Sequence, residues 1–369
     1  MSKKQNLSSE SIGLIKLSKG FLTNAINVLA SVEQDSSPEC DILFFKIEDG
    51  KLFLVKRNRF SEIIINCDSA EITCNDSIIP VLFEDMVKIS KTLDDEIDIK
   101  IIDGKMEIIG EEYKYIIQSF NLTFPMLSKI DNITSDLAAF SLPNSIVKEL
   151  YSSLVVAPLK RNPSCLDSIY FHEGSAYCVD HSIMSKFNIG KQINIDKPIP
   201  LFLFSVSQKL NEECSVSFYP TEKNIAMSFN IGDLDHVVCV CSYLNGDYPI
   251  DKVSEIFNSY PNKSILVENN LFLNSLKKVK SISGKQLPIT SCRIVKDKMI
   301  IKLAYSEKSI ETRLSVTVPT EAIDFEFKII IDGLFNAIKK MENSLEVSFT
   351  DKFFIVKDSK LTHILPLSY

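Results

Sequence analysis

The sequence predicts an α+β protein made of three copies of one domain, with antiparallel sheets covered on one face by helices. Turn-and-strand segments return at a regular interval, at Glu48 to Lys56 (EDGKLFLVK), His172 to Asp180 (HEGSAYCVD) and Lys296 to Ala304 (KDKMIIKLA). Segments with a strand followed by a helix also return, and they begin at Leu14, Ala139 and Ser264. Each copy therefore spans about 120 residues, which is the size of a domain and too long for a solenoid repeat.

Each copy is doubled internally. Its second half runs helix, strand, turn, strand, as in PVLFEDMVKISKTLDDEIDIKIIDGKMEIIG. Alternating apolar residues indicate the strands, and Asp-Gly, Thr-Glu-Lys-Asn and Asp-Lys indicate the turns. Apolar residues at helical spacing indicate two helices per copy. The expected helices cover 18–29, 82–92, 144–154, 201–210, 269–280 and 332–341.

Aromatic-proline pairs mark the domain boundaries. Phe124-Pro125 and Tyr248-Pro249 each follow strand-like segments, and Pro366 stands in a similar setting. Proline cannot continue a central ladder, so we expect a last strand to end at each of these places. The expected organisation is a flexible tail at 1–12, then domains at 13–134, 135–258 and 259–369. The tail is polar and has no apolar segment, which argues against a secretory signal.

Composition indicates a soluble globular protein. The 369 residues are 45% hydrophobic, without an apolar run long enough to span a membrane. The nine cysteines form no CxxC pair, and Cys239 and Cys241 alternate in an apolar strand, as buried free thiols do. This pattern favours a reducing compartment, the cytoplasm. The four histidines have no metal-ligand spacing, so we expect neither a metal nor a cofactor.

Charge is distributed unevenly. The chain has 41 Lys+Arg against 48 Asp+Glu, yet lysines outnumber acids in the expected helices. The acids there are Glu84, Asp85, Glu149 and Asp332. The lysines are Lys19, Lys88, Lys91, Lys148, Lys209, Lys277, Lys278, Lys280, Lys339 and Lys340.

Two interpretations of these lysines remain open. They are typical of solvated helix faces and of helix ends, where they complement the helix dipole. Their recurrence in a three-fold repeat favours a shared basic surface, which suits a polyanion bound without sequence preference. The sequence has no helix-turn-helix, zinc finger or aromatic stacking platform that would read bases.

An enzymatic function is not indicated. The motifs GxxxxGK[ST], GxGxxG, HExxH and GxSxG are absent from the sequence. The acidic pairs Asp94-Asp95 and Glu111-Glu112 fall at expected turns, where solvated charge clusters are far commoner than catalytic pairs. We therefore expect a non-catalytic protein.

From Leu14 to Tyr369 the arrangement resembles the bacterial sliding clamp family, the beta subunit of DNA polymerase III. FSLPNSIVKELYSSL resembles the opening of the family's second domain, YLNGDYPIDKV its end, and HILPLSY the terminal strand and tail. The chain also departs from the family pattern. The family's TDGHR stretch is VDHSI here (Val179 to Ile183), and its first-domain counterpart is VKRNR (Val55 to Arg59).

The resemblance implies the DNA clamp fold and a non-catalytic processivity factor. Two subunits would close head to tail into a ring around double-stranded DNA and tether the replicative DNA polymerase III. A clamp loader, the polymerase III catalytic subunit and other polymerases would be partners, through linear peptide motifs, with no cofactor and no membrane. The alternative is a clamp-fold scaffold for protein interactions that does not encircle DNA.

The resemblance also implies site residues. Tyr115 and Ile117 match interface positions on one face of the family subunit, and Ile282 matches one on the opposing face. All three could equally be ordinary core residues. The helix lysines would face DNA.

A partner-peptide pocket would lie beside the C-terminal tail. Its wall would be Leu166, Val179, Met184, Pro249, Leu365, Pro366 and Leu367. Apolar side chains at a domain junction can anchor a peptide, although Leu365 and Leu367 could instead complete a core. Ile183 and Ser368 stand where the family often has basic residues, so we expect a different polar rim.

Overall fold

The computed structural model describes residues 13–32, 37, 39–93, 95–102, 105–120, 138–154, 164–180, 182–193, 195–210, 213–231, 234–259, 264–282, 289–305, 308–318 and 324–368. The expected tail at 1–12, the pair Phe124-Pro125, Asp94 and Tyr369 lie outside the described residues. Within the described ranges, none of the helices is both long enough and apolar enough to cross a membrane.

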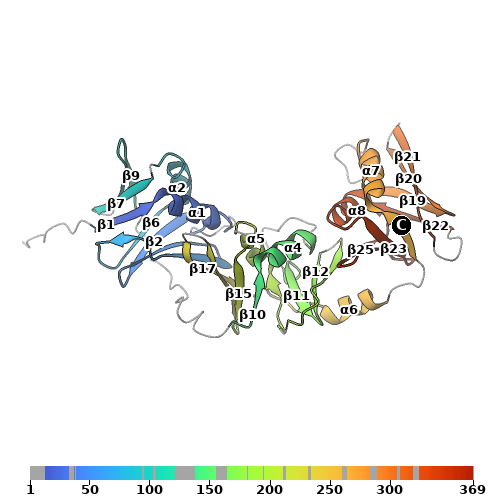
Figure 1. The fold of residues 1–369 in the computed structure, drawn as a ribbon, viewed down its shortest axis with the longest axis horizontal. Helices are drawn as coiled ribbons and strands as arrows, with labels where there is room; N and C mark the ends of the chain where they lie inside the picture. The colour runs from blue at the N-terminus through green and yellow to red at the C-terminus, as the bar shows by residue number, and fades with distance from the viewer. Residues whose placement is uncertain are drawn as a thin grey trace, which may run out of the picture. The chain divides into compact units, whose positions relative to one another are not determined.

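The chain forms two compact units (Figure 1). Unit 1 consists of Met1–Lys148 and Phe202–Tyr243, and unit 2 of Glu149–Leu201 and Leu244–Tyr369. The expected second domain, 135–258, therefore contributes segments to both units. The division into three domains stays a prediction, because the boundary between the two units runs through the expected second domain.

Unit 1 has two antiparallel sheets. The five-stranded sheet has the order β5-β1-β7-β8-β9, and the eight-stranded sheet the order β10-β15-β16-β17-β4-β3-β2-β6. The strands of the first sheet are β1 (Gly13–Ser18), β5 (Glu71–Ile72), β7 (Glu96–Ile102), β8 (Lys105–Ile109) and β9 (Lys114–Gln118). Those of the second are β2 (Ile42–Glu48), β3 (Lys51–Arg57), β4 (Ser61–Cys67), β6 (Ser77–Leu82), β10 (Phe140–Pro143), β15 (Ser215–Pro220), β16 (Asn224–Ile231) and β17 (Leu234–Ser242).

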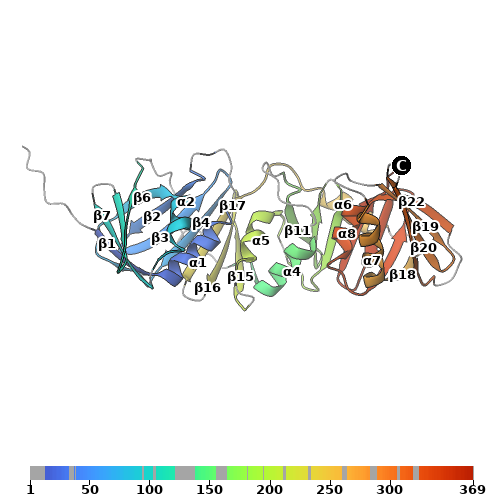
Figure 2. The same cartoon turned by 90° about the horizontal axis from the view of Figure 1, so that it is seen from above.

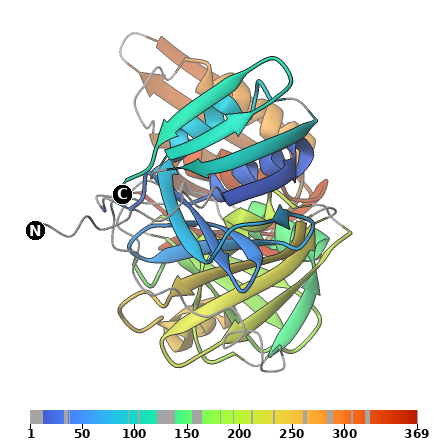
Figure 3. The same cartoon turned by 90° about the vertical axis from the view of Figure 1, so that its left-hand side faces the viewer.

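Helix α1 (Lys19–Leu29) lies between these sheets, because it contacts β1 of the first and β3 and β17 of the second. In Figure 3 the dark-blue α1 lies below the teal strands. Phe21, Leu22 and Ala25 are fully buried there. Helix α2 (Phe83–Ile89) contacts β6.

Unit 2 repeats the design. Its eight-stranded sheet has the order β14-β11-β12-β13-β25-β24-β23-β18, and its four-stranded sheet the order β21-β20-β19-β22. The strands of the larger sheet are β11 (Ser168–His172), β12 (Ser175–Val179), β13 (Met184–Asn188), β14 (Ile199–Pro200), β18 (Ser264–Glu268), β23 (Ser344–Phe349), β24 (Phe353–Lys357) and β25 (Leu361–Pro366). Those of the smaller are β19 (Ile289–Val295), β20 (Lys298–Tyr305), β21 (Lys308–Ser315) and β22 (Asp324–Ile330).

Helices α7 (Asn269–Lys280) and α8 (Ile331–Ile338) lie side by side in Figure 2 and contact each other. Helix α7 contacts β18, β20 and β21, and α8 contacts β22 and β25, so the pair connects both sheets of unit 2. Helices α4 (Asn144–Leu154) and α5 (Leu201–Ser207) continue from one unit into the other along the chain. The α+β fold class and the predicted helices are confirmed.

The two eight-stranded sheets are copies of each other. Taken from β6, the first reads β6-β2-β3-β4-β17-β16-β15-β10, and the second reads β14-β11-β12-β13-β25-β24-β23-β18. The recurrent turn has the same backbone in both. Asp49-Gly50 has φ angles of 52° and 74°, and Glu173-Gly174 has 48° and 74°. Two successive positive φ values are those of a tight hairpin turn.

Helix α6 (Ile250–Asn258) was not predicted. The pair Tyr248-Pro249 was expected to end a last strand, but β17 already ends at Ser242, and Pro249 is the N-cap residue of α6. Val253 and Phe257 are buried on one face, and Asp251 lies in the first turn, where it complements the helix dipole. Helices α2, α5 and α8 end earlier than predicted, so Lys91, Lys209, Lys339 and Lys340 lie just after them.

All nine cysteines are free thiols, as predicted. Cys239 and Cys241 are buried in β17, and burial raises the pKa of the Cys241 thiol to about 12. These thiols are therefore neutral core residues.

His363 is a buried histidine in β25. Its Nδ1 lies 2.8 Å from the Ser185 hydroxyl, and no described residue hydrogen-bonds its Nε2. Burial lowers the pKa of His363 from 6.5 to about 4, and nearby Asp358 only partly opposes this effect. A charged imidazolium is thus excluded from the folded sheet at neutral pH.

We predict a pH-dependent stability caused by His363. As the pH falls from 6.5 towards about 4, the unfolded chain binds a proton that the folded chain excludes, so the free energy of unfolding decreases through this window. The full shift corresponds to about 3 kcal/mol. Urea unfolding between pH 8 and pH 5 should show a steeper decline for the native chain than for His363→Leu. Equal slopes in the two proteins would contradict the prediction.

Candidate functional site

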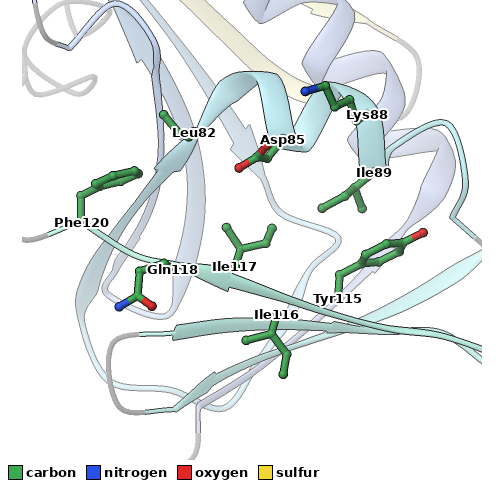
Figure 4. Close-up of a pocket in the computed structure, with 9 residues that line it drawn as sticks. All are labelled: Leu82, Asp85, Lys88, Ile89, Tyr115, Ile116, Ile117, Gln118 and Phe120. Atoms are coloured by element: carbon green, nitrogen blue, oxygen red, sulfur yellow. The ribbon is translucent and has the colours of Figure 1, made fainter.

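A shallow pocket of about 290 Å³ lies between α2 and the edge strand β9 (Figure 4). It is lined by Leu82, Asp85, Lys88, Ile89, Tyr115, Ile116, Ile117, Gln118 and Phe120. In Figure 4 the side chains of Tyr115 and Ile117 point towards α2, and that of Ile116 points to the other side of the strand. Two of the predicted interface residues therefore lie together at this edge.

The exposed apolar side chains at this edge belong to residues that were not predicted as interface residues. Ile116 is 60% exposed, Phe120 39% and Leu82 37%, whereas Ile117 is only 7% exposed. The Tyr115 hydroxyl lies 3.0 Å from Thr92 Oγ1. Strand alternation, which places Ile116 opposite its neighbours, was the signal that could have identified it.

β9 and β21 are outer strands of their sheets in the described chain. Inside each unit, the sheet of one repeat joins the next by strand pairing. β4 pairs with β17, from Ser61 with Cys241 to Asn66 with His236, and β13 pairs with β25. By position in the repeat, β9 corresponds to β17 and β25, and β21 corresponds to β4 and β13. In the described parts of the chain, β9 and β21 therefore have no counterpart of the pairing that joins β4 to β17 and β13 to β25.

The β21 edge lies next to α7. The two elements are in contact, and half-buried Ile282, the third predicted interface residue, follows the end of α7. On β21, Ile310 and Thr312 are half-buried, and Glu311 forms ion pairs with Lys302 at 2.8 Å and Arg313 at 2.6 Å.

Most of the predicted DNA-facing lysines are exposed. Lys19 and Lys148 are half-buried, and the exposed ones are Lys88, Lys91, Lys209, Lys277, Lys278, Lys280, Lys339 and Lys340. Several of them lie in or just after the last turn of a helix, where cations complement the helix dipole.

Three of the four acids on these helices form ion pairs with lysines. Glu84 pairs with Lys88 at 2.8 Å, and the Glu149 pair with Lys360 measures 3.1 Å. Asp332 pairs with Lys280 at 2.5 Å. Lys280 also lies 5.2 Å from the centre of the Phe335 ring, so it is held between α7 and α8. Lys277 and Lys278 are exposed in the last turn of α7, next to this ion pair.

Two residues of the predicted peptide pocket, Val179 and Met184, lie on the sheet face that α6 covers. Val179 and Met184 pack against a cluster that includes Tyr177 and Ile364 from the sheet and Phe257 from α6. The Tyr177 ring contacts that of Phe257 edge to face, with centroids 5.6 Å apart. Exposed Pro249 leads into α6. This helix, which was not predicted, therefore lies beside Val179 and Met184, which were predicted pocket residues.

The remaining predicted pocket residues are spread over both faces of this sheet. Leu365 is 2% exposed, and both it and Ile183 approach Gly333 of α8, on the face opposite α6. Pro366 is exposed, and half-buried Leu367 donates its N–H to Lys352 O at 2.9 Å. Leu166 is half-buried before β11. Leu365 is therefore a core residue, and the pocket as a whole stays a prediction.

Comparison with known proteins gives no sequence match. No protein-family model matches the chain, and no curated protein matches it. In the described parts of the chain, no three histidine, cysteine, aspartate or glutamate residues are grouped so that they could hold a metal ion.

Solved structures match the fold over nearly the whole chain. The DNA polymerase III beta subunit of Thermotoga maritima is 15% identical with a TM-score of 0.81, covering 97% of this chain and 99% of its own. The sliding clamp of Bacillus subtilis is 15% identical with a TM-score of 0.81, and the match covers 97% of this chain and 100% of that clamp. The DNA polymerase III beta subunit of Pseudomonas aeruginosa is 12% identical with a TM-score of 0.81, and the match covers 96% of this chain and 99% of that subunit. The chain therefore has the DNA clamp fold of these DNA polymerase III beta subunits.

Proposed function

We propose that this protein is a DNA sliding clamp, a non-catalytic processivity factor that encircles double-stranded DNA and tethers the replicative DNA polymerase. The observation that carries the proposal is the pair of outer strands, β9 and β21, on a clamp fold. Each is the counterpart of a strand that is paired at the junctions β4–β17 and β13–β25.

A head-to-tail homodimer follows from these edges. β9 of one copy would pair with β21 of a second copy, and the reciprocal pairing would close the ring. Closure removes both open edges, which would otherwise remain available for aggregation. Exposed Ile116 and Phe120 on one side, and Ile282 and Ile310 on the other, supply apolar surface for the contact.

The helix lysines suit loose binding of DNA. The six helix windows carry ten lysines against four acids, so they present net positive charge despite the formal charge of -7 for the whole chain. Non-specific phosphate contacts of this kind position DNA without reading its sequence. Ring topology would provide retention, and mobile contacts would permit sliding.

Partners would include a clamp loader, the polymerase III catalytic subunit and other polymerases, in the cytoplasm. Linear peptides would bind near Val179 and Met184, where α6 and the sheet form an apolar surface.

A loading assay on nicked circular DNA tests the whole proposal. With a cognate clamp loader and ATP, the protein should remain on circular DNA and leave when the circle is cut. Loss from circular and linear DNA at the same rate would reject the sliding clamp and favour a scaffold that does not encircle DNA.

Ile116→Lys should weaken the dimer at least ten-fold, because a charge would replace an apolar side chain in the interface core. Sedimentation velocity over a concentration series measures this effect. Leu266→Lys, at a leucine that is 44% exposed on β18, is the matched control and should leave dimerisation unchanged. A monomeric native chain at micromolar concentration would contradict the prediction.

Lys277→Ala combined with Lys278→Ala should shorten retention on circular DNA and reduce the slope of log affinity against log salt by about 2. The folded state should change little in stability, because both side chains are exposed. Lys352→Ala with Lys357→Ala, two exposed lysines at the β24 strand, is the control. An unchanged salt slope in the α7 variant would show that these lysines do not face DNA.

Met184→Lys should weaken binding of a labelled peptide that carries the polymerase clamp-binding motif by ten-fold or more, since Met184 lies in the proposed apolar surface. Fluorescence anisotropy measures the affinity. The same variant should still form dimers, which separates this site from the ring interface. Undiminished peptide affinity would place the site elsewhere.

A further inference from the structure

Unit 1 contains a second pocket, of about 120 Å³, at the turn between β3 and β4. Its walls include Arg57, Arg59, Ser61, Glu62, Asn224 and Ser242. Ligand sites for drug-sized molecules are commonly several hundred Å³, and a water molecule occupies roughly 30 Å³ of liquid. This pocket therefore has room for one side chain of a partner.

This pocket and the apolar surface of Val179 and Met184, which lies beside α6 in unit 2, occupy corresponding positions in the two units. The Asn58 carboxamide oxygen accepts hydrogen bonds from the backbone N–H of Phe60 (2.9 Å) and Ser61 (2.8 Å). Asp180 accepts equivalent bonds from Ser182 and Ile183 in the corresponding turn of unit 2.

The facing turns also correspond. The Thr221 hydroxyl accepts from Asn224 N at 3.0 Å, and the Thr350 hydroxyl accepts from Phe353 N at 3.0 Å. Both units thus hold the same pair of turns around one place on the sheet.

The side chains beside these two turns differ in chemical character between unit 1 and unit 2. The pairing Glu62 with Val240 in unit 1 corresponds to Met184 with Ile364 in unit 2. In the same way, Arg57 takes the place of Val179 and Ser242 the place of Pro366. The unit 2 surface is apolar, and the unit 1 pocket is polar.

Glu62 is the unusual group in this pocket. It is 8% exposed, and no described residue donates a hydrogen bond to its buried Oε1. A buried acceptor without a donor destabilises the fold, and it does so more strongly if it is charged.

The nearby cations are engaged with other acids. Arg57 Nε lies 3.0 Å from Glu39, and Lys46 lies 2.7 Å from Glu48. Burial raises the pKa of Glu62 to about 7, Arg57 and Lys46 oppose the shift, and Glu39 adds to it. Arg59 is exposed at the rim, with its guanidinium 5.5 Å from the centre of the Phe60 ring.

We propose that this pocket is a second partner site, which binds a lysine or arginine side chain from a peptide segment of another protein, with Glu62 as the acceptor. A cationic donor satisfies the orphan oxygen and stabilises the ionised carboxylate. The neighbouring Ser61, Asn224 and Ser242 provide a polar surround for such a group. The inference goes beyond the clamp function and does not depend on it, since every residue involved belongs to unit 1.

Fluorescein-labelled, capped tetrapeptides test the site by anisotropy: Ala-Ala-Arg-Ala, Ala-Ala-Lys-Ala, Ala-Ala-Glu-Ala and Ala-Ala-Ala-Ala. The basic peptides should bind saturably and the other two should not. Glu62→Gln should reduce affinity ten-fold or more while keeping side-chain shape. Affinity for the native chain should increase as the pH rises through about 7, because the carboxyl ionises.

Two further variants complete the experiment. Met184→Ala changes only the corresponding surface of unit 2 and should bind the basic peptides normally. Ser242→Leu should block the pocket without removing the carboxylate, and thermal unfolding of each variant verifies folding. Equal affinity of the native chain and a folded Glu62→Gln variant, no saturable binding of the basic peptides, or preference for the acidic peptide would overturn the proposal.

Discussion

Strand pairing between successive repeats is the constraint on which the rest of the structure depends. In the described chain, neither eight-stranded sheet is formed by one repeat alone. β4 requires β17, and β13 requires β25, so each eight-stranded sheet is shared between two repeats. The helices then fill the space between sheets, as α1 does in unit 1 and the α7–α8 pair does in unit 2. The same pairing rule leaves β9 and β21 as outer strands in the described chain, and the proposed dimer is based on them.

One backbone frame carries two different surfaces. The Asn58 and Asp180 turns keep the same hydrogen bonds although the side chains beside them have diverged, from Val179 and Met184 to Arg57 and Glu62. The backbone bonds are local and depend on one capping side chain. Side chains beside these turns can therefore differ in chemistry without altering the sheet. This difference is the basis for the proposal that the two surfaces bind different partners.

Periodic features of the sequence predicted the fold well, and features that depend on tertiary contact were missed. The α1 helix and the Asp49-Gly50 turn follow from apolar spacing and turn residues. Helix α6 was overlooked because Pro249 was taken to end a strand, whereas β17 already ends at Ser242 and Pro249 begins a helix. Burial of Glu62 depends on Val240 and other neighbours that lie far away in sequence, so no local pattern reported it. Lys280 likewise seemed equivalent to Lys277 until its ion pair with Asp332 was located.

The position of β25 has a consequence for biosynthesis. This strand inserts between β13 and β24, yet roughly 170 residues separate it from β13. At a translation rate of about 5–20 residues per second, β13 waits on the order of ten to thirty seconds for its neighbour. During that interval the nascent chain presents an unsatisfied row of backbone donors and acceptors, which is a target for chaperones and for mispairing with other chains on the same messenger RNA. Contacts of such high sequence separation also make folding slow.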